Sequence, residues 1–437
     1  MRVPSPTRTV GILLATAAAV VAAASPAQAR PQGPGSFTGY GFDTCSAPSQ
    51  KTMDAWNLNS PFTAIGIYVS GNSRYCGDQY QPNLTPTWVS TNSTNGWRFL
   101  PIHVGYQSPC FKNNPNSRVQ KKHMSTNVNT ARSQAHSDAL ETIAALKRLG
   151  FKDANTASFL DLEWYSRTKA CDNVVLEFID EWTETLHENH FMSGVYSSGS
   201  AAIKAMDDAL AARRSGFNRP DYAWIAWTNG EANVDGGTYL RDSFFTPHRR
   251  IHQYLNGKTV SYAGSSVNID WDWVDIGYGS VPSVEPKPCG VRMSFNTYPT
   301  LKAGSTGREV SALQCLLKLR GYSVPVNGSF GSSTTSALNQ WASSMGWKPV
   351  SRTTPATWTA LLSAGPKPRV LKRGSVGESV WRLQRALRAA GDNAPTNGLY
   401  DAATVTAVQA YRDANGLTKY QTAEGTVWGL LQRGHTG

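Results

Sequence analysis

After its first 29 residues the chain has no apolar run long enough to cross a membrane, so we expect no membrane association once that segment is removed. Residues 1–29 contain Arg2 and Arg8, then a short alanine-rich apolar stretch, and end in the small residues AQA. This pattern is typical of a secretory signal peptide rather than a transmembrane anchor. No cysteine lies near the expected cleavage point at Ala29, which argues against a lipoprotein.

Cysteine is scarce, and its spacing does not favour zinc. The chain has six cysteines and no C-x-x-C pair. An even number in an exported protein indicates disulfides. We see no zinc triad and no Cys/His pair free of expected disulfides, which leaves an amidase or peptidase weakly supported. We expect no metal and no cofactor.

Acidic residues are scarce in the last third of the chain. Residues 281–437 contain 18 Lys/Arg and 7 Asp/Glu, a net charge of +11, whereas residues 30–280 contain 22 and 23, a net charge of −1. In an exported protein this basic region indicates binding to an anionic surface such as wall polymers, and not to nucleic acid. The alternative is a basic surface that serves solubility alone.

The basic region is an internal duplication with a constant offset of 70 residues. The segment GSTGREVSALQCLLKLRGY (304–322) returns as GSVGESVWRLQRALRAAGD (374–392), and the Asn-Gly turn and the tryptophan that follow also return. Apolar residues at helical spacing predict three short helices per copy. The G-x-x-G, L-Q and N-G-x-[FY] elements resemble the peptidoglycan-binding domain of bacterial wall hydrolases. A three-helix spacer without a ligand is the alternative.

Apolar runs alternate with helical segments through the first 250 residues of the mature chain. The predicted strands are 38–45, 62–71, 98–107, 158–165, 191–198, 222–228, 249–255 and 267–274, and the clearest helices are 130–150, 173–189 and 200–214. The polar segment 82–96 is expected to be a long loop. Eight strands over about 250 residues predict an α/β fold, a (β/α)₈ TIM-type barrel, followed by two small three-helix all-α modules.

Four acidic residues fall at strand ends in this arrangement. Asp161 and Glu163 lie two apart on the fourth strand, Asp43 ends the first strand and Asp270 lies on the eighth. Because the C-terminal strand ends of such a barrel form the active site, we expect the four acids to converge as catalytic residues. We expect substrate-binding side chains around them: Tyr68, His103, Tyr165, Tyr196, Trp227, Gln253, Tyr254 and Asp272.

Several of these residues have structural alternatives. The alternative for Asp161 and Glu163 is that both form salt bridges with a structural role only. No basic residue alternates with them on the strand, which argues against this alternative. His103 is more often a core histidine than a catalyst, and Trp227 and Tyr196 could be barrel packing. Acids ringed by aromatic side chains are nevertheless what a sugar-cleaving site requires.

The ordered motifs GFD, DLE, VYSS, WIAW, HQY and IDWD resemble the family 25 glycoside hydrolases, lysozymes of the muramidase type. The segments GFDTCSAPS and AIGIYVSG are similar to the actinobacterial glycoside-hydrolase-like domain related to them. The eighth-strand motif departs from the lysozyme pattern, because Asp270 and Asp272 flank Trp271 where an acid-x-Asn is usual. We therefore expect a signal peptide (1–29), a barrel (36–280), a linker (281–297), repeat 1 (298–364) and repeat 2 (365–435).

The resemblance implies a secreted, wall-associated glycoside hydrolase that cleaves β-1,4 linkages between N-acetyl sugars of peptidoglycan. Glu163 would be the general acid, Asp161 would stabilise positive charge or orient the acetamido group, and Asp43 and Asp270 would hold the pair. We expect an enzyme, and leave open a catalytically silent protein that binds wall glycan. The expected partner is peptidoglycan or a related wall glycan, with no nucleic acid, and the expected state is a monomer.

Barrel geometry also predicts how the cysteines pair. Loops that follow adjacent strands lie side by side at one barrel end, which predicts the bridges 45–76 and 110–171. Cys289 precedes repeat 1 and Cys315 lies in its first helix, where repeat 2 has Arg385. From the 15 possible pairings we therefore expect the following bridges: Cys45–Cys76, Cys110–Cys171 and Cys289–Cys315.

Overall fold

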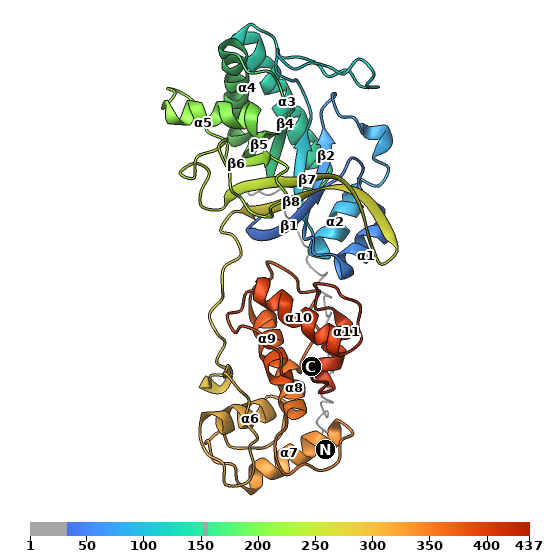
Figure 1. The fold of residues 1–437 in the computed structure, drawn as a ribbon, viewed down its shortest axis with the longest axis vertical. Helices are drawn as coiled ribbons and strands as arrows, with labels where there is room; N and C mark the ends of the chain where they lie inside the picture. Colours follow the sequence, from blue (N-terminus) through green and yellow to red (C-terminus); the bar gives the residue numbers. More distant parts are fainter. Residues whose placement is uncertain (1–32, 152–155) are drawn as a thin grey trace, which may run out of the picture.

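A computed structural model describes residues 33–151 and 156–437 of the chain. It contains a closed eight-stranded barrel, followed by six helices in two groups of three (Figure 1). The predicted fold class is confirmed. The expected signal peptide, residues 1–29, lies outside the described residues. Within the described residues, no helix combines the length and the apolar character that a membrane crossing requires.

The eight strands follow one another in chain order around the barrel. They are β1 (Phe37–Asp43), β2 (Ala64–Ser70), β3 (Arg98–His103), β4 (Ala157–Leu162), β5 (Met192–Ser198), β6 (Tyr222–Ala226), β7 (Arg249–Tyr262) and β8 (Ser265–Ile276). All eight predicted strands are present. Strands β1 to β7 pair in parallel, whereas β8 is antiparallel to both β7 and β1.

The antiparallel β8 departs from a regular (β/α)₈ barrel and has a local cause. Strands β7 and β8 extend beyond their predicted ends and are joined by Ala263 and Gly264 alone, both with positive φ (48° and 77°). A two-residue turn with positive φ at both positions reverses the chain into a hairpin, and a hairpin can only be antiparallel. A loop, rather than a helix, also joins β6 to β7.

Five α-helices accompany the barrel: α1 (Gln50–Asn59), α2 (Pro86–Thr94), α3 (Val128–Arg148), α4 (Lys169–Glu188) and α5 (Lys204–Ala211). Helices α3 and α4 match their predictions, and α5 follows a turn of π-helix, Gly199–Ile203, within the third predicted segment. The expected loop at 82–96 is wrong, because it contains α2. The Thr85 side chain caps this helix by accepting from the Trp88 amide, and Pro86 begins it.

Aromatic rings of β4 and β6 fill the interior of the barrel. Glycines on β5 and β2 face these rings, where a larger side chain would overlap them. Phe159 on β4 and Trp224 on β6 contact each other edge to face, with ring centroids 5.3 Å apart. A methyl group at Gly194 would lie 2.3 Å from the Phe159 ring, and one at Gly66 would lie 3.1 Å from Trp224. The Trp224 ring thus forms a floor beneath the carboxyl ends of the strands.

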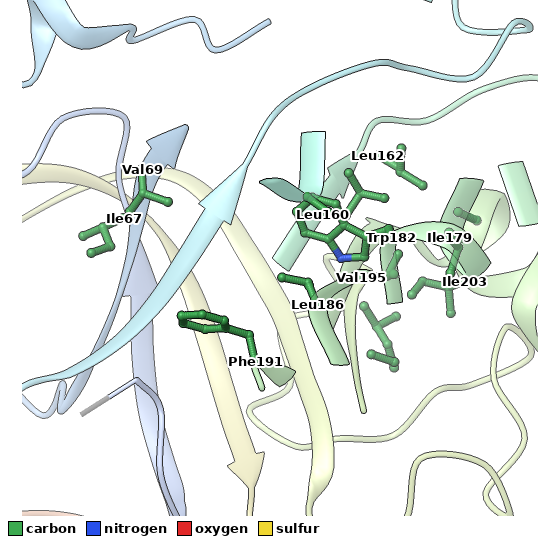
Figure 2. Close-up of a cluster of buried hydrophobic side chains, with 14 of the residues drawn as sticks. Ile67, Val69, Leu160, Leu162, Ile179, Trp182, Leu186, Phe191, Val195 and Ile203 are labelled. Carbon is green, nitrogen blue, oxygen red and sulfur yellow. The ribbon is translucent and has the colours of Figure 1, made fainter. Parts of the chain in front are cut away.

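The outward faces of the strands pack against the helices in a second apolar layer. In Figure 2, Leu160 and Leu162 of β4 and Val195 of β5 lie near Trp182 of α4. Residues therefore alternate along β4 between the outer layer (Leu160, Leu162) and the interior (Phe159). This alternation decides which side chains can reach the mouth of the barrel.

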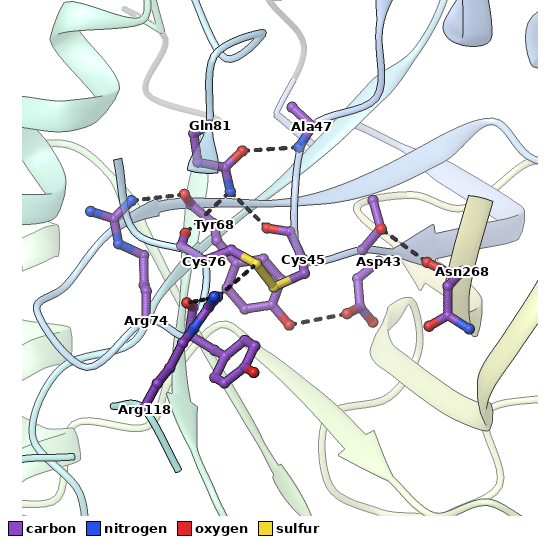
Figure 3. Close-up of a disulfide and its surroundings, with 11 residues drawn as sticks. Asp43, Cys45, Ala47, Tyr68, Arg74, Cys76, Gln81, Arg118 and Asn268 are labelled. Atoms are coloured by element: carbon purple, nitrogen blue, oxygen red, sulfur yellow. Dashed lines mark hydrogen bonds between the residues drawn. A yellow bond between two sulfur atoms is a disulfide. The ribbon is translucent and has the colours of Figure 1, made fainter. Parts of the chain in front are cut away.

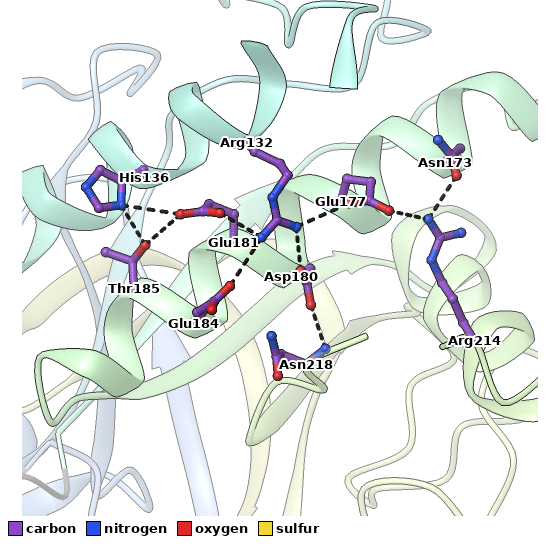
Figure 4. Close-up of polar contacts among 10 residues, drawn as sticks. All are labelled: Arg132, His136, Asn173, Glu177, Asp180, Glu181, Glu184, Thr185, Arg214 and Asn218. Atoms are coloured by element: carbon purple, nitrogen blue, oxygen red, sulfur yellow. Dashed lines mark hydrogen bonds and ion pairs between the residues drawn. The ribbon is translucent and has the colours of Figure 1, made fainter. Parts of the chain in front are cut away.

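Helices α3 and α4 are joined on the outside by one arginine. Figure 4 shows Arg132 of α3 among four carboxylates of α4: Glu177, Asp180, Glu181 and Glu184. The hydrogen bond to Asp180, followed by the other carboxylates, raises the pKa of Arg132. The guanidinium therefore stays charged and holds the two longest helices together.

Each repeat consists of three helices, as predicted: α6 (Arg308–Lys318), α7 (Ser332–Ser344) and α8 (Pro355–Ser363), then α9 (Glu378–Ala390), α10 (Ala402–Ala414) and α11 (Gly425–Gln432). The repeated glutamine explains the L-Q motif. Gln314 is fully buried, donates to Asn327 Oδ1, Ser329 O and Thr334 Oγ1, and accepts from the Asn327 and Gly328 amides. Gln384 repeats this pattern, so the motif closes the turn that follows the first helix.

Repeat 2 packs against the end of the barrel opposite the mouth, and repeat 1 lies beyond it (Figure 1). The buried Lys372 donates to the backbone and side-chain oxygens of Asn57, both at 3.1 Å. Thr422 donates to the Leu58 carbonyl at 2.8 Å, and Ser280 donates to Gly374 at 2.7 Å.

The segment expected to be a linker, residues 281–297, packs on repeat 2. Arg385 of α9 contacts Glu285 at 3.1 Å, and the Trp381 indole donates to Ser283. Met293 and Phe295 of the segment are buried in one apolar cluster with both repeats. The segment is therefore held along its length.

Candidate active site

The barrel mouth contains a cavity of about 210 Å³, lined by residues of β1, β2, β4 and β8 and of the loops beside them. All four predicted catalytic acids line it: Asp43, Asp161, Glu163 and Asp270. Asp270 belongs to the first half of β8, yet it reaches the carboxyl end of β1 because β8 is antiparallel. The register places it directly opposite Asp43. Tyr68, one of the predicted substrate-binding residues, also lines the cavity.

Asp43 is buried and hydrogen-bonded at both carboxylate oxygens. The Tyr68 hydroxyl donates to Oδ1 at 3.1 Å, and the Gln253 amide donates to Oδ2 at 3.0 Å. Gln253 in turn accepts from the Tyr196 hydroxyl at 2.9 Å and lies 3.4 Å from Asp270 Oδ2. These three predicted substrate-binding residues therefore hold the acids in place from the barrel interior.

Asp270 is fixed by an irregularity in the neighbouring strand. The register between β7 and β8 shifts around Gly257, whose φ is +63°. The Gly257 amide points at Asp270 and donates to its Oδ1 at 2.6 Å. Glycine suits this position because other side chains rarely adopt a positive φ.

Burial changes the proton affinity of these acids. Burial, followed by the charge of Asp270, raises the pKa of Asp43 to about 7, against the opposing hydrogen bonds of Gln253 and Tyr68. Burial, followed by the charge of Glu163, raises the pKa of Asp161 well above its ordinary value. The raised pKa favours the protonated form of Asp161, in which its carboxyl group can donate a hydrogen bond.

Glu163 differs from the other acids because its side chain is 42% exposed and forms an ion pair with Lys121 Nζ at 2.6 Å. Lys121 belongs to the loop after β3, which also provides the buried Gln107. The Gln107 side chain accepts from the Glu163 amide at 2.8 Å and donates to the Asp161 carbonyl at 2.9 Å. Lys121 and Gln107 were not predicted as site residues. Their position in a loop that follows a strand was the signal that could have indicated them.

All three disulfides form as predicted, and one of them lies at the cavity. The structure contains Cys45–Cys76, Cys110–Cys171 and Cys289–Cys315. Figure 3 shows the first bridge next to Asp43, and both of its cysteines line the cavity. The bridge thus fixes the loops after β1 and β2 beside the acids.

Two aromatic residues at or beside the mouth are exposed and were not predicted. Tyr75 lines the cavity with 54% of its surface exposed, and Trp164 next to Glu163 is 56% exposed. The Arg118 guanidinium covers the Tyr75 ring at 3.9 Å and donates to the Tyr75 carbonyl. Exposed rings of this kind can stack on sugar faces.

Two predicted mouth residues lie elsewhere. His103 ends β3 on its outward side: it is fully buried, its ring packs on Trp182 of α4 and its Nδ1 lies 2.8 Å from Ser70 Oγ. Tyr165 lies beyond the end of β4, so strand alternation no longer fixes its direction. It is 1% exposed, and its hydroxyl donates to Asp172 at the start of α4. Neither side chain lines the mouth.

Three more predicted binding residues support the site from further away. Trp227 packs edge to face on Tyr239 in the loop after β6, and Tyr254 is 4% exposed beside Trp271. Asp272 is fully buried beneath the mouth, where its Oδ1 accepts from the Trp224 indole at 2.9 Å. Asp272 therefore belongs to the floor of the site rather than to its surface.

Other hollows and clusters lie away from these acids. A larger groove of about 860 Å³ separates α4 from α5 outside the barrel and is lined in part by Arg167, Leu176 and Arg214. In the part of the chain that the structure describes, the group with the spacing to hold a metal ion is His103, Asp138 and Glu141, also outside the barrel.

Comparison with known families gives two matches. Residues 54–274 match the model of the Rv2525c-like, glycoside hydrolase-like domain, and residues 306–361 match a peptidoglycan binding domain. The second match falls within repeat 1. A search of curated proteins found no match.

Solved structures that match part of this chain share little sequence with it. An uncharacterized B. stearothermophilus protein has 15% identity and a TM-score of 0.34, and the match covers 54% of this chain and 95% of that one. The catalytic domain of endolysin ply40 from a Listeria monocytogenes bacteriophage has 14% identity and a TM-score of 0.31, over 55% and 93%. The Clostridium perfringens spore cortex lytic enzyme SleM has 15% identity and a TM-score of 0.34, over 54% and 67%.

Proposed function

The chain belongs to the Rv2525c-like family of glycoside hydrolase-like domains, and on that premise we propose that it is a secreted cell-wall glycosidase. The proposed reaction is hydrolysis of β-1,4 linkages between N-acetyl sugars of peptidoglycan. One observation carries this proposal: four carboxyl groups, on β1, β4 and β8 and directly after β4, line a single cavity, and burial raises the pKa of one of them, Asp161, well above its ordinary value. Glycoside hydrolysis uses a protonated and an ionised carboxyl group together.

Accessibility favours Glu163 as the group that faces the leaving oxygen. Its carboxyl group is 42% exposed in the cavity, whereas Asp161 is 5% exposed. In its protonated form Asp161 would donate a hydrogen bond to the acetamido oxygen of the substrate. Asp43 and Asp270, held by Gln253, line the same cavity, where an ionised carboxylate would stabilise the positive charge that develops on the sugar ring.

A second function, glycan binding without hydrolysis, is supported by the ion pair between Glu163 and Lys121. With the Lys121 ammonium 2.6 Å from its carboxylate, Glu163 cannot protonate a leaving oxygen until a substrate displaces Lys121. A barrel in which Lys121 stays in place would bind sugars between the acids and the exposed rings of Tyr75 and Trp164 without cleaving them.

We assign wall attachment to repeat 1. The positions in repeat 2 that contact the barrel, Lys372 and Thr422, are buried, whereas their equivalents in repeat 1, Lys302 and Arg352, are exposed. Lys302 and Arg352 pair in an isolated β-bridge, so two exposed basic residues lie side by side on repeat 1, which suits an anionic polymer. The three disulfides and the peptidoglycan binding domain of the chain fit an extracellular wall protein. Export by residues 1–29 stays a prediction.

Digestion of purified cell walls by the full mature chain tests the hydrolase. We expect the wild type to release reducing sugar ends and Glu163→Gln to release none, with thermal unfolding temperatures within a few degrees of each other. Glu184→Gln is a matched control, because Glu184 is 46% exposed and paired with Arg132, but lies outside the barrel on α4. If the wild type releases no reducing ends from walls or chitin-like glycans, glycan binding is the better function. Lys121→Met then reports whether the ion pair is what silences the site.

A further inference from the structure

A second cluster of chemically active side chains lies behind the barrel mouth. His103 ends β3, and Asp138 and Glu141 lie one turn apart on α3. One nitrogen or oxygen atom from each of the three residues falls within 4.8 Å of the others. The cluster lines no part of the mouth cavity, and the proposed hydrolysis does not use it.

His103 is held in the orientation of a metal ligand. Its ring is fully buried, and its Nδ1 lies 2.8 Å from the buried Ser70 hydroxyl. When Nδ1–H donates to this hydroxyl, the lone pair of Nε2 is free to bind a metal ion. A ligating histidine usually donates its other ring N–H to such a partner. His103 Nε2 makes no hydrogen bond and faces Asp138 Oδ2 at 3.3 Å.

The distance between His103 Nε2 and Asp138 Oδ2 is compatible with a metal ion bound between the two atoms. Hydrogen bonds from nitrogen to oxygen span about 2.7–3.2 Å. Two ligand atoms about 2.0–2.1 Å from a tetrahedral zinc ion lie roughly 3.4 Å apart, and the observed separation is 3.3 Å.

Backbone amides orient both carboxylates. The Tyr106 amide donates to Asp138 Oδ2 at 3.1 Å, and the Gly71 amide donates to Glu141 Oε1 at 2.9 Å. Asp138 is 3% exposed, whereas Glu141 is exposed, so the site is closed on one side and open to solvent on the other. An ion can therefore enter past Glu141.

The backbone at Gly105 leaves this space free. A methyl group there would lie 1.8 Å from Asp138 Oδ2 and 2.5 Å from His103 Nε2. Any larger residue at 105 would push the two side chains apart.

The buried series Ser70, His103, Asp138 also has the order of a hydrolase triad, but its accessibility excludes that role. Ser70 is 2% exposed and lies outside the mouth cavity, so no substrate reaches its hydroxyl group. The remaining alternative is a buried histidine–carboxylate contact that serves stability alone.

We propose that His103, Asp138 and Glu141 bind one divalent transition-metal ion, zinc by preference, with water as the fourth ligand. A neutral imidazole and two carboxylates carry a charge of −2, which matches a divalent ion, and imidazole and carboxylate oxygen are both zinc ligands. The ion ties the loops after β2 and β3 to α3. The same loops carry Cys76 and Lys121 into the mouth cavity, so the metal shapes the rim of the active site.

Metal binding by the full untagged chain tests the proposal. Protein treated with a chelator is dialysed against zinc, and bound zinc is measured by elemental analysis and calorimetry. We expect one zinc ion per chain and a rise in the unfolding temperature. Glu141→Gln, an exposed substitution that removes one anionic ligand, should weaken zinc binding at least 10-fold, and His103→Asn should abolish it.

His136→Gln is the matched control. His136 also lies on α3 and also faces a carboxylate, Glu181 at 3.3 Å, but it is 48% exposed and has no third ligand. This variant should bind zinc as the wild type does. The proposal is overturned if the wild type binds no zinc, or if Glu141→Gln, which keeps its fold, binds zinc as tightly as the wild type.

Discussion

Lys372 makes the contact between repeat 2 and the barrel depend on pH. Lys372 is 5% exposed, and its ammonium group donates to two oxygens of Asn57 and lies 4.8 Å above the Trp97 ring. Burial lowers the pKa of Lys372 from 10.5 to about 7. A lysine in a separated repeat 2 would keep the higher value, so docking releases a proton between these two pH values.

The size and sign of the effect follow from this difference. Each unit of pKa corresponds to about 1.4 kcal/mol. Below pH 7 the lysine is charged in both states, and its burial costs roughly 5 kcal/mol. As the pH rises from 7 to 10, the cost falls by about 1.4 kcal/mol per unit, so the docked state gains stability with pH. Lys372→Met keeps the apolar stem and loses the charge, which removes this slope.

The measurement is the free energy of urea unfolding at pH 7, 8, 9 and 10. The difference between wild type and Lys372→Met isolates the lysine, because other titrating groups contribute to both proteins. Lys302→Met is the control, since Lys302 is the exposed equivalent in repeat 1. We expect Lys302→Met to keep the wild-type slope. A difference curve between wild type and Lys372→Met that is flat over this range would refute the reasoning, and with it the burial of Lys372 at the interface.

Three further predictions concern stability. The pKa of Asp43 is about 7 in the folded state, against an ordinary value of 3.8, so wild-type stability should fall as the pH rises from 4 to 7. Asp43→Asn should flatten that decline in thermal unfolding. Gln314→Leu should destabilise repeat 1 by about 2–4 kcal/mol in urea, because it leaves buried donors and acceptors unpaired. Gly194→Ala should destabilise the barrel by about 1–3 kcal/mol, since its methyl group overlaps the Phe159 ring; unchanged unfolding would contradict the tight interior.

Much of the fold could be predicted because it is encoded in local patterns. Apolar runs of strand length gave all eight strands, and a constant offset gave both repeats. Two of the three disulfides followed from one topological rule, since loops after adjacent strands share a barrel end. The direction of β8 could have been predicted from Ala263 and Gly264, because a turn of two residues leaves no length for a crossover.

The directions of individual side chains were harder to predict. Alternation along a strand distinguishes inward-facing from outward-facing residues only within the strand. Strand β4 ends at Leu162, so alternation does not fix the direction of Tyr165. Lys121 and Gln107 lie in an irregular loop, where no period tells which side chain turns toward the acids. The contact of Lys372 joins residues 315 positions apart, and nothing in either local sequence indicates it.

Ionisable side chains are buried at both ends of the barrel. At the mouth, Asp43, Asp161 and Asp272 are buried with raised pKa values, and a fold selected for stability alone would not keep three such acids together. At the opposite end a buried lysine joins the barrel to repeat 2 at a similar cost. Ionisable groups are therefore buried both where chemistry is proposed and where the binding module is attached. Acidification relieves the first cost and imposes the second, so pH should shift the mouth and the interface in opposite directions.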